Sequence, residues 1–139
     1  MTEDKILLKA LTPEAKAALG GIYYKIARFP FRVGRESRTV TNEGYIGSRR
    51  QTNPVPNNDI YLAETGDLFN ISREHFLIDV QGGNYVLVDR GSACGTLVEG
   101  ELVGEKRKGG SRQLSNNDVI IAGTSESKFI FKFLMADDS

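Results

Sequence analysis

The sequence predicts an all-β fold, a sandwich of two antiparallel sheets with a short helical insertion near the N-terminus. Three observations lead to this prediction. Short runs of β-branched and aromatic residues recur from the middle of the chain onward. The 15 glycines mostly separate these runs, and turn signals recur about every 8–12 residues, as in antiparallel sandwiches. Strands do not alternate with helices, so a doubly wound parallel sheet is not expected.

One segment near the N-terminus has the features of a helix. Thr12 can cap its first turn, Pro13 suits its first position and Gly20 can end it. The flanking residues 5–11 and 22–27 look like strands. We therefore expect the helix to be an insertion in the first hairpin.

Strand signals dominate the second half of the chain. Four apolar runs carry them, at residues 76–80, 85–88, 119–121 and 129–133. Glycines at 82 and 83 can supply the positive φ angles of a tight hairpin between the first two runs. The sequence therefore predicts consecutive antiparallel strands here.

Composition favours one small globular domain and excludes several functional classes. The 139 residues carry 18 basic and 18 acidic side chains, so no overall field favours nucleic acid or an anionic membrane. No apolar run reaches the roughly 20 residues of a membrane-spanning helix, and the polar N-terminus is unlike a signal peptide. One cysteine and one histidine are too few for a typical zinc site. We expect a single cytoplasmic domain over residues 1–139, without metal or cofactor.

Four short patterns occur in a fixed order. They are residues 31–35 (FRVGR), 58–62 (NDIYL), 71–76 (ISREHF) and 89–100 (DRGSACGTLVEG), followed by 114–120 (LSNNDVI). An arginine after a strand-ending glycine lies on a loop, where its planar fork can bind an anion. A serine followed by a second arginine adds a hydroxyl donor and another positive charge. This mixture of groups suits a phosphate.

Together these patterns resemble the forkhead-associated (FHA) family, with its Gly-Arg, Asn-Asp-Ile, Ser-Arg-x-His, Ser-x-Asn-Gly-Thr and Leu-x-x-Gly-Asp-x-Ile motifs. The resemblance covers about residues 22–135. It implies a non-catalytic sandwich whose loops gather at one end and dock on a phosphothreonine segment of a partner, such as a kinase or a kinase substrate.

The resemblance also implies residue roles. Contacts to the phosphopeptide fall on Arg35, Ser72, Arg73, Ala93 and Cys94. Loop-structuring roles fall on Gly34, Asn58, Asp59, His75, Gly95 and Thr96.

Departures from the family pattern leave an alternative open. Ala93 and Cys94 replace a frequently hydroxylated residue and an asparagine that commonly contact the ligand, and Glu99 replaces a later asparagine. A thiol is a poor substitute for an amide, so weak or unusual ligand selection is expected. The alternative is an FHA-fold scaffold or self-association domain that binds independently of phosphate.

Several residues have more than one interpretation. Arg73 can bind an anion or form a surface ion pair with Glu74. His75 near Ser72 or Cys94 suggests nucleophilic catalysis, but no third group is present, so a structural histidine is favoured. We therefore expect no enzymatic activity.

A basic and aromatic stretch around residues 28–32 suggests contact with nucleic acid, but the zero net charge argues against that partner.

Residues 36–57 form a long polar stretch where the family has only a few residues. We interpret it as an irregular loop insertion that is functional or disordered. Its three arginines, at 38, 49 and 50, are candidates to extend the phosphate site or to favour an acidic partner. Its hydroxyl residues, Thr39, Thr41, Ser48 and Thr52, are candidates for phosphorylation and binding in cis.

Overall fold

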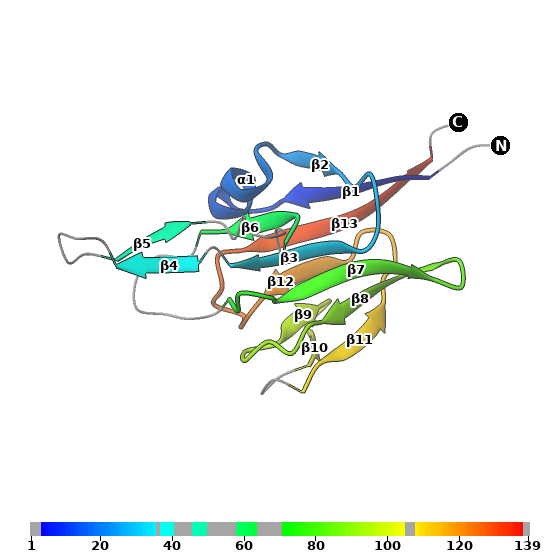
Figure 1. The fold of residues 1–139 in the computed structure, drawn as a ribbon. Helices are drawn as coiled ribbons and strands as arrows, with labels where there is room; N and C mark the ends of the chain where they lie inside the picture. Colours follow the sequence, from blue (N-terminus) through cyan, green and yellow to red (C-terminus); the bar gives the residue numbers. More distant parts are fainter. Residues whose placement is uncertain are drawn as a thin grey trace.

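The computed structural model describes residues 4–35, 37–40, 46–49, 58–63, 71–104 and 108–137. They form two stacked β-sheets, a small two-stranded sheet and one short helix (Figure 1). The predicted all-β sandwich with a helical insertion is confirmed. One strand pair, β3 with β6, is parallel rather than antiparallel.

The first sheet has six strands in the order β10-β9-β12-β13-β1-β2, all antiparallel. Their bounds are β1 Asp4–Ala10, β2 Tyr23–Lys25, β9 Thr96–Val98, β10 Glu101–Val103, β12 Val119–Ala122 and β13 Ile130–Asp137. Pairing of β1 with β13 runs from Asp4 opposite Asp137 to Ala10 opposite Phe131. The first and last strands of the chain therefore lie side by side.

The second sheet has five strands in the order β11-β8-β7-β3-β6. Their bounds are β3 Phe31–Arg35, β6 Ile60–Leu62, β7 Phe76–Gln81, β8 Asn84–Asp89 and β11 Gly110–Gln113. The predicted hairpin between β7 and β8 is confirmed, with Gly82 and Gly83 at positive φ in its turn.

The small sheet corrects the interpretation of residues 36–57 as irregular. Strands β4 (Ser37–Val40) and β5 (Ile46–Arg49) pair antiparallel, with Val40 opposite Ile46. Their β-branched residues favour strands, but the runs are short and lie among glycine, proline and asparagine. The rest of the insertion lies outside the described residues.

Helix α1 (Pro13–Leu19) lies between β1 and β2, which pair with each other, so the predicted insertion in the first hairpin is confirmed. The Thr12 hydroxyl accepts a hydrogen bond from the Ala15 amide at 3.2 Å. Gly20 ends the helix with φ of 77°, where its amide donates to the Lys16 carbonyl. Ala15 and Leu19 pack into the core.

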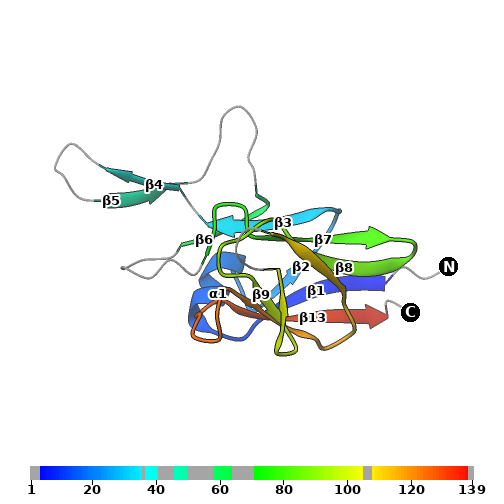
Figure 2. The same ribbon diagram turned by 90° about the horizontal axis from the view of Figure 1, so that it is seen from below.

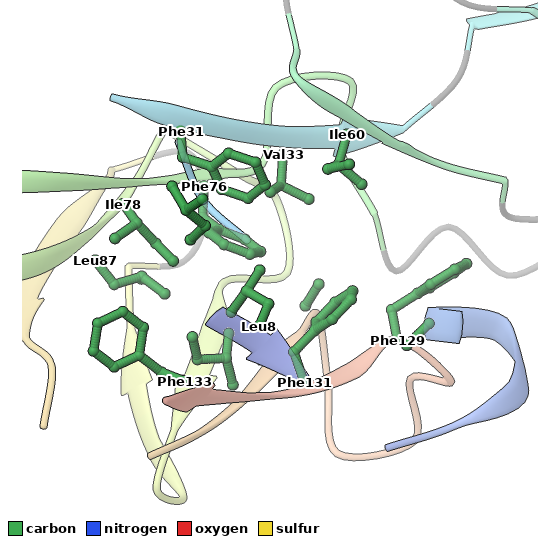
Figure 3. Packing of buried hydrophobic residues seen from close by; sticks show 14 of the residues in the cluster. Leu8, Phe31, Val33, Ile60, Phe76, Ile78, Leu87, Phe129, Phe131 and Phe133 are labelled. Atoms are coloured by element: carbon green, nitrogen blue, oxygen red, sulfur yellow. The ribbon is translucent and has the colours of Figure 1, made fainter. Parts of the chain in front are cut away.

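The core lies between the two large sheets (Figure 3). Alternation along β3 sends every second side chain inward: Phe31 and Val33 are buried, whereas Arg32 is only partly covered. Phe131 and Phe133 of β13 approach them from the other sheet. Each such fully buried apolar side chain contributes about 1.5–3 kcal/mol of transfer free energy.

The end of β3, the start of β7 and the end of β8 lie at one end of the sandwich, opposite the two chain termini (Figures 1 and 2). The β4–β5 hairpin projects from that same end. Among the described residues, no helix has both the length and the hydropathy needed to cross a bilayer.

Candidate functional site

The turn before β7 is fastened to the end of β3. The Arg35 amide donates to the Ser72 carbonyl at 3.0 Å, and the His75 amide donates to the Val33 carbonyl at 3.1 Å. Ser72 and Arg73 are thereby held beside Arg35, although they are far apart in the sequence. Arg73 is exposed, and Ser72 and Arg35 are partly exposed.

His75 is fully buried and joins two loops. Its Nδ1 accepts from the Ser72 amide at 3.0 Å, and its Nε2 lies 2.7 Å from the Gly95 carbonyl. These partners fix the neutral tautomer with the proton on Nε2. Burial lowers the pKa of His75 and outweighs the hydrogen bond with the Gly95 carbonyl and the charge of Asp89, which raise it; the charge of Arg90 adds a small lowering effect. Both ring nitrogens are engaged by backbone groups, which leaves neither to activate a hydroxyl or a thiol.

Asn58 and Gly34 support the same turn from behind. Asn58 is 2% exposed, and its Nδ2 donates to the Arg73 carbonyl at 2.8 Å. A Cβ at Gly34 would lie 2.0 Å from that carbonyl oxygen and 2.7 Å from the Asn58 amide. Only glycine therefore allows the turn to lie this close to β3.

Asp59 fastens β6 to β3. Its Oδ2 accepts from the backbone amide of Arg32 at 2.8 Å and from Nε of Arg32 at 3.2 Å. Burial raises the pKa of Asp59, but the hydrogen bonds and charge of Arg32, with a smaller effect of Arg28, outweigh it and hold the pKa below its ordinary value. Arg32 is thus engaged in an ion pair with Asp59.

The loop between β8 and β9 is organised around Asp89, which the sequence analysis did not select. Its carboxylate accepts from the Ser92 amide (2.8 Å), the Ser92 hydroxyl (2.6 Å) and the Thr96 hydroxyl (3.0 Å). The Ser92 Oγ in turn accepts from the Gly95 amide at 2.9 Å. Asp89 has Gly91 and Ser92 two and three residues later, a spacing typical of an Asx-type turn, and this signal could have identified Asp89 and Ser92.

A further hydrogen bond connects this loop with the turn before β7. The Ala93 amide donates to Ser72 Oγ at 3.1 Å. The Ser72 hydroxyl therefore acts as an acceptor inside the protein, and its own hydrogen remains available to donate to an anion. On the β8–β9 loop, Ala93 is exposed and the next residue, Cys94, is partly exposed.

Arg90 is a second residue that sequence reasoning missed. Its guanidinium donates to Asn58 Oδ1 at 2.6 Å and to Glu74 Oε2 at 2.7 Å, and its amide donates to the His75 carbonyl at 2.9 Å. Glu74 thus forms an ion pair with Arg90. Nothing in the sequence signals these contacts, because they depend on how the loops are packed.

The structure brings Arg35, Ser72, Arg73, Ala93 and Cys94 to one end of the sandwich, on two hydrogen-bonded loops and the end of β3. Beneath them lie five of the six residues with predicted loop-structuring roles, all buried; the sixth, Asp59, is partly buried. Among the described residues, no group of three or more His, Cys, Asp or Glu side chains could hold a metal ion. The site therefore offers directed donors and positive charge.

Comparison with known proteins identifies the family. The family model of the FHA domain matches residues 31–123, so the chain belongs to the FHA domain family, as the sequence patterns predict. FHA domains are protein-interaction modules that bind phosphorylated protein segments. No curated protein sequence matches the chain.

Solved FHA structures share the fold. One is Mycobacterium tuberculosis EmbR in complex with a low affinity phosphopeptide (23% identity, TM-score 0.61). The match covers 99% of this chain but only 26% of the EmbR chain. Another is the FHA domain of Chlamydia trachomatis CT664 (22% identity, TM-score 0.56), with 97% of this chain and 99% of that chain covered. A third is the kinase-interacting FHA domain of the Arabidopsis phosphatase KAPP (18% identity, TM-score 0.65), with 100% and 99% covered.

Proposed function

We propose that this chain is a phosphothreonine-dependent interaction module that docks reversibly on a phosphorylated segment of a partner protein, without chemistry on the ligand. One observation carries the proposal: the Ser72 turn is fixed between the end of β3 and the Ala93 loop. This arrangement supports the proposal because it holds the backbone of Ser72 against that of Arg35, with Arg73 next in the same turn.

The energetics support discrimination between phosphorylated and bare peptide. A hydrogen bond to a charged group contributes about 1.5–3 kcal/mol. Donors held by surrounding hydrogen bonds lose little entropy when the ligand arrives. Arg35, Ser72 and Arg73 together thus suffice for strong selection of the phosphate.

The second loop favours weak or unusual selection of the rest of the peptide. Ala93 offers no side-chain donor, and the thiol of Cys94 is a poor one. We propose that the peptide backbone is held less firmly than the phosphate. The same two residues favour the alternative function, a scaffold that binds its partner, or itself, independently of phosphate.

We also propose the setting of the module. Residues 1–139 form one domain, because β1 and β13, beyond the residues matched by the family model, pair within the six-stranded sheet. Its partner is a kinase or a kinase substrate rather than nucleic acid or a membrane. The single cysteine favours a reducing compartment such as the cytoplasm.

Binding of a degenerate phosphothreonine peptide library tests the function, with the unphosphorylated library as the control. We expect affinity near micromolar, about −8 kcal/mol, and loss of binding in Arg35→Ala. Arg28→Ala is the matched variant, because it removes an exposed arginine before β3 rather than at its end. Equal binding of both libraries would refute phosphate dependence and support the scaffold function.

A further inference from the structure

The outer face of the six-stranded sheet is a second surface with a distinct chemistry. Val98, Ile120 and Phe131 point into the core. Side chains alternate along a strand, so their neighbours Leu97, Ile121 and Ile130 point to the opposite, outer side.

These outer residues form a continuous line across four strands. Leu102 lies opposite Leu97, Leu97 opposite Ile121, and Ile121 opposite Ile130. All are at least partly exposed, and Leu102 is 45% exposed. We call these four residues the apolar row. Cross-strand partners on one face contact one another, so the row is one contiguous surface.

Lysines lie beside the apolar row. Lys9 of β1 is directly opposite Lys132 of β13, and Lys9 is also opposite Tyr23 of β2, with its Nζ 5.8 Å from the ring centroid. Two more lysines face outward by the same alternation, Lys5 and Lys25. Like charges directly opposite one another destabilise a sheet. An acidic partner would remove that cost.

No acidic residue occupies the outward strand positions of the six-stranded sheet that the structure describes. Those positions are Lys5, Leu7, Lys9, Tyr23, Lys25, Leu97, Leu102, Val119, Ile121, Ile130, Lys132, Leu134 and Ala136. Glu99 lies in the turn after β9, and its carboxylate accepts from the Val119 amide at 2.7 Å. The outer face of the other sheet differs, because Arg32 and Asp79 give it both signs of charge.

We propose that this outer face binds an acidic amphipathic helix of a partner protein. The apolar row crosses three strand spacings of about 4.8 Å each, or about 14 Å in all. A helix rises 1.5 Å per residue, so about ten residues span that length. The apolar stripe of such a helix contacts the row, and its acidic flank lies over Lys9 and Lys132.

A protein helix fits this face better than a membrane surface. Interfacial membrane segments insert apolar side chains, often tryptophan, several ångströms into the lipid. Here most of the apolar side chains are partly buried by their neighbours, and the chain has no tryptophan. The face uses no residue of the phosphate site, so the two surfaces can act independently.

The test is a titration of the isotope-labelled full chain with two synthetic helical peptides that share one leucine stripe. One peptide carries glutamates on its polar face and the other carries lysines. We expect the glutamate peptide, but not the lysine peptide, to shift the amide signals of Leu97, Ile121 and Ile130.

The double variant Lys9→Glu and Lys132→Glu keeps a like-charged pair, so its folding cost is comparable with that of the unmodified chain. In it, we expect the glutamate peptide to bind about tenfold more weakly and the lysine peptide to bind instead.

Three results would overturn the proposal. The first is that the glutamate peptide causes no shifts, or that the double variant and the unmodified chain bind it equally. The second is binding to vesicles that contain an anionic lipid without binding to the peptide, which would assign the face to a membrane. The third is concentration-dependent dimerisation that Ile121→Ser abolishes, which would assign it to a second copy. Phosphopeptide affinity is measured alongside, and we expect the double variant to leave it unchanged.

Discussion

At the scale of single residues, the turn that carries Ser72 and Arg73 depends on buried residues beneath it. Gly34 is one of them, because the carbonyl of Arg73 occupies the space where a Cβ would be. We expect Gly34→Ala to displace the Ser72 turn and therefore to lower phosphopeptide affinity. We also expect it to lower the free energy of unfolding by several kcal/mol. Gly21→Ala is the control, since its Cβ would meet nothing closer than 3.9 Å. Urea unfolding and peptide titration of both variants check this, and similar behaviour of the two would contradict it.

Arg90 supports the same turn through Asn58, Glu74 and the His75 carbonyl. Arg90→Met leaves the buried Asn58 oxygen without this donor, and we expect a loss of about 1–3 kcal/mol in unfolding free energy. Glu74→Gln removes only the exposed half of the ion pair, so we expect it to cost less than about 1 kcal/mol. Equal losses in urea unfolding would show that Arg90 acts through Glu74 alone.

His75 makes the stability of the protein dependent on pH. The unfolded chain takes up a proton at this residue near pH 6.5, whereas burial keeps the folded form neutral to lower pH. Its contribution to stability is complete above about pH 6.5 and declines as pH falls toward the folded pKa. The limiting slope is about 1.4 kcal/mol per pH unit.

Urea unfolding between pH 7.5 and 5.5 measures that slope. This is the only histidine in the chain, and the lowered pKa of Asp59 acts in a separate window below about pH 4. We therefore expect His75→Gln to flatten the profile between these two pH values. An unchanged profile in the variant would contradict the assignment to His75.

At the scale of elements, the β4–β5 hairpin differs from the other strands because it forms a separate two-stranded sheet. Strand β4 begins two residues after Arg35, which places the hairpin next to the proposed phosphate site. We expect deletion of residues 38–55 to change peptide selectivity while the two large sheets still fold, because all of their strands lie outside that range. Library selection on the deleted chain checks this, and unchanged selectivity would exclude a role of the insertion in recognition.

At the scale of the whole molecule, the two proposed binding surfaces lie on different parts of the sandwich. The proposed phosphate site lies at the loop end, the chain termini lie at the other end, and the apolar row crosses the outer face of one sheet. Arg112 of β11 ties the sheets together through Glu101 (3.2 Å) and the Val98 carbonyl (3.2 Å). A partner bound at one surface therefore leaves the other surface accessible.

Sequence reasoning was most successful where the signal is local. The helix from Thr12 to Gly20 and the hairpin at Gly82 were predicted because capping and turn residues act on their own neighbours. Arg90 was missed because its partners Asn58 and Glu74 lie in other loops, and the apolar row exists only through strand register. Asp89 was missed although its partners Ser92 and Thr96 are local. Strands β4 and β5 were missed because their short β-branched runs lie among turn-forming residues.

The measurement that tests the central claim most directly is a titration of the isotope-labelled chain with a selected phosphothreonine peptide. We predict that the amide signals of Ser72, Arg73, Ala93 and Cys94 shift, and that those of Leu97 and Ile121 do not. The unphosphorylated peptide should leave all of these signals in place. Shifts confined to other residues, or equal shifts with both peptides, would contradict phosphate docking at this end of the sandwich.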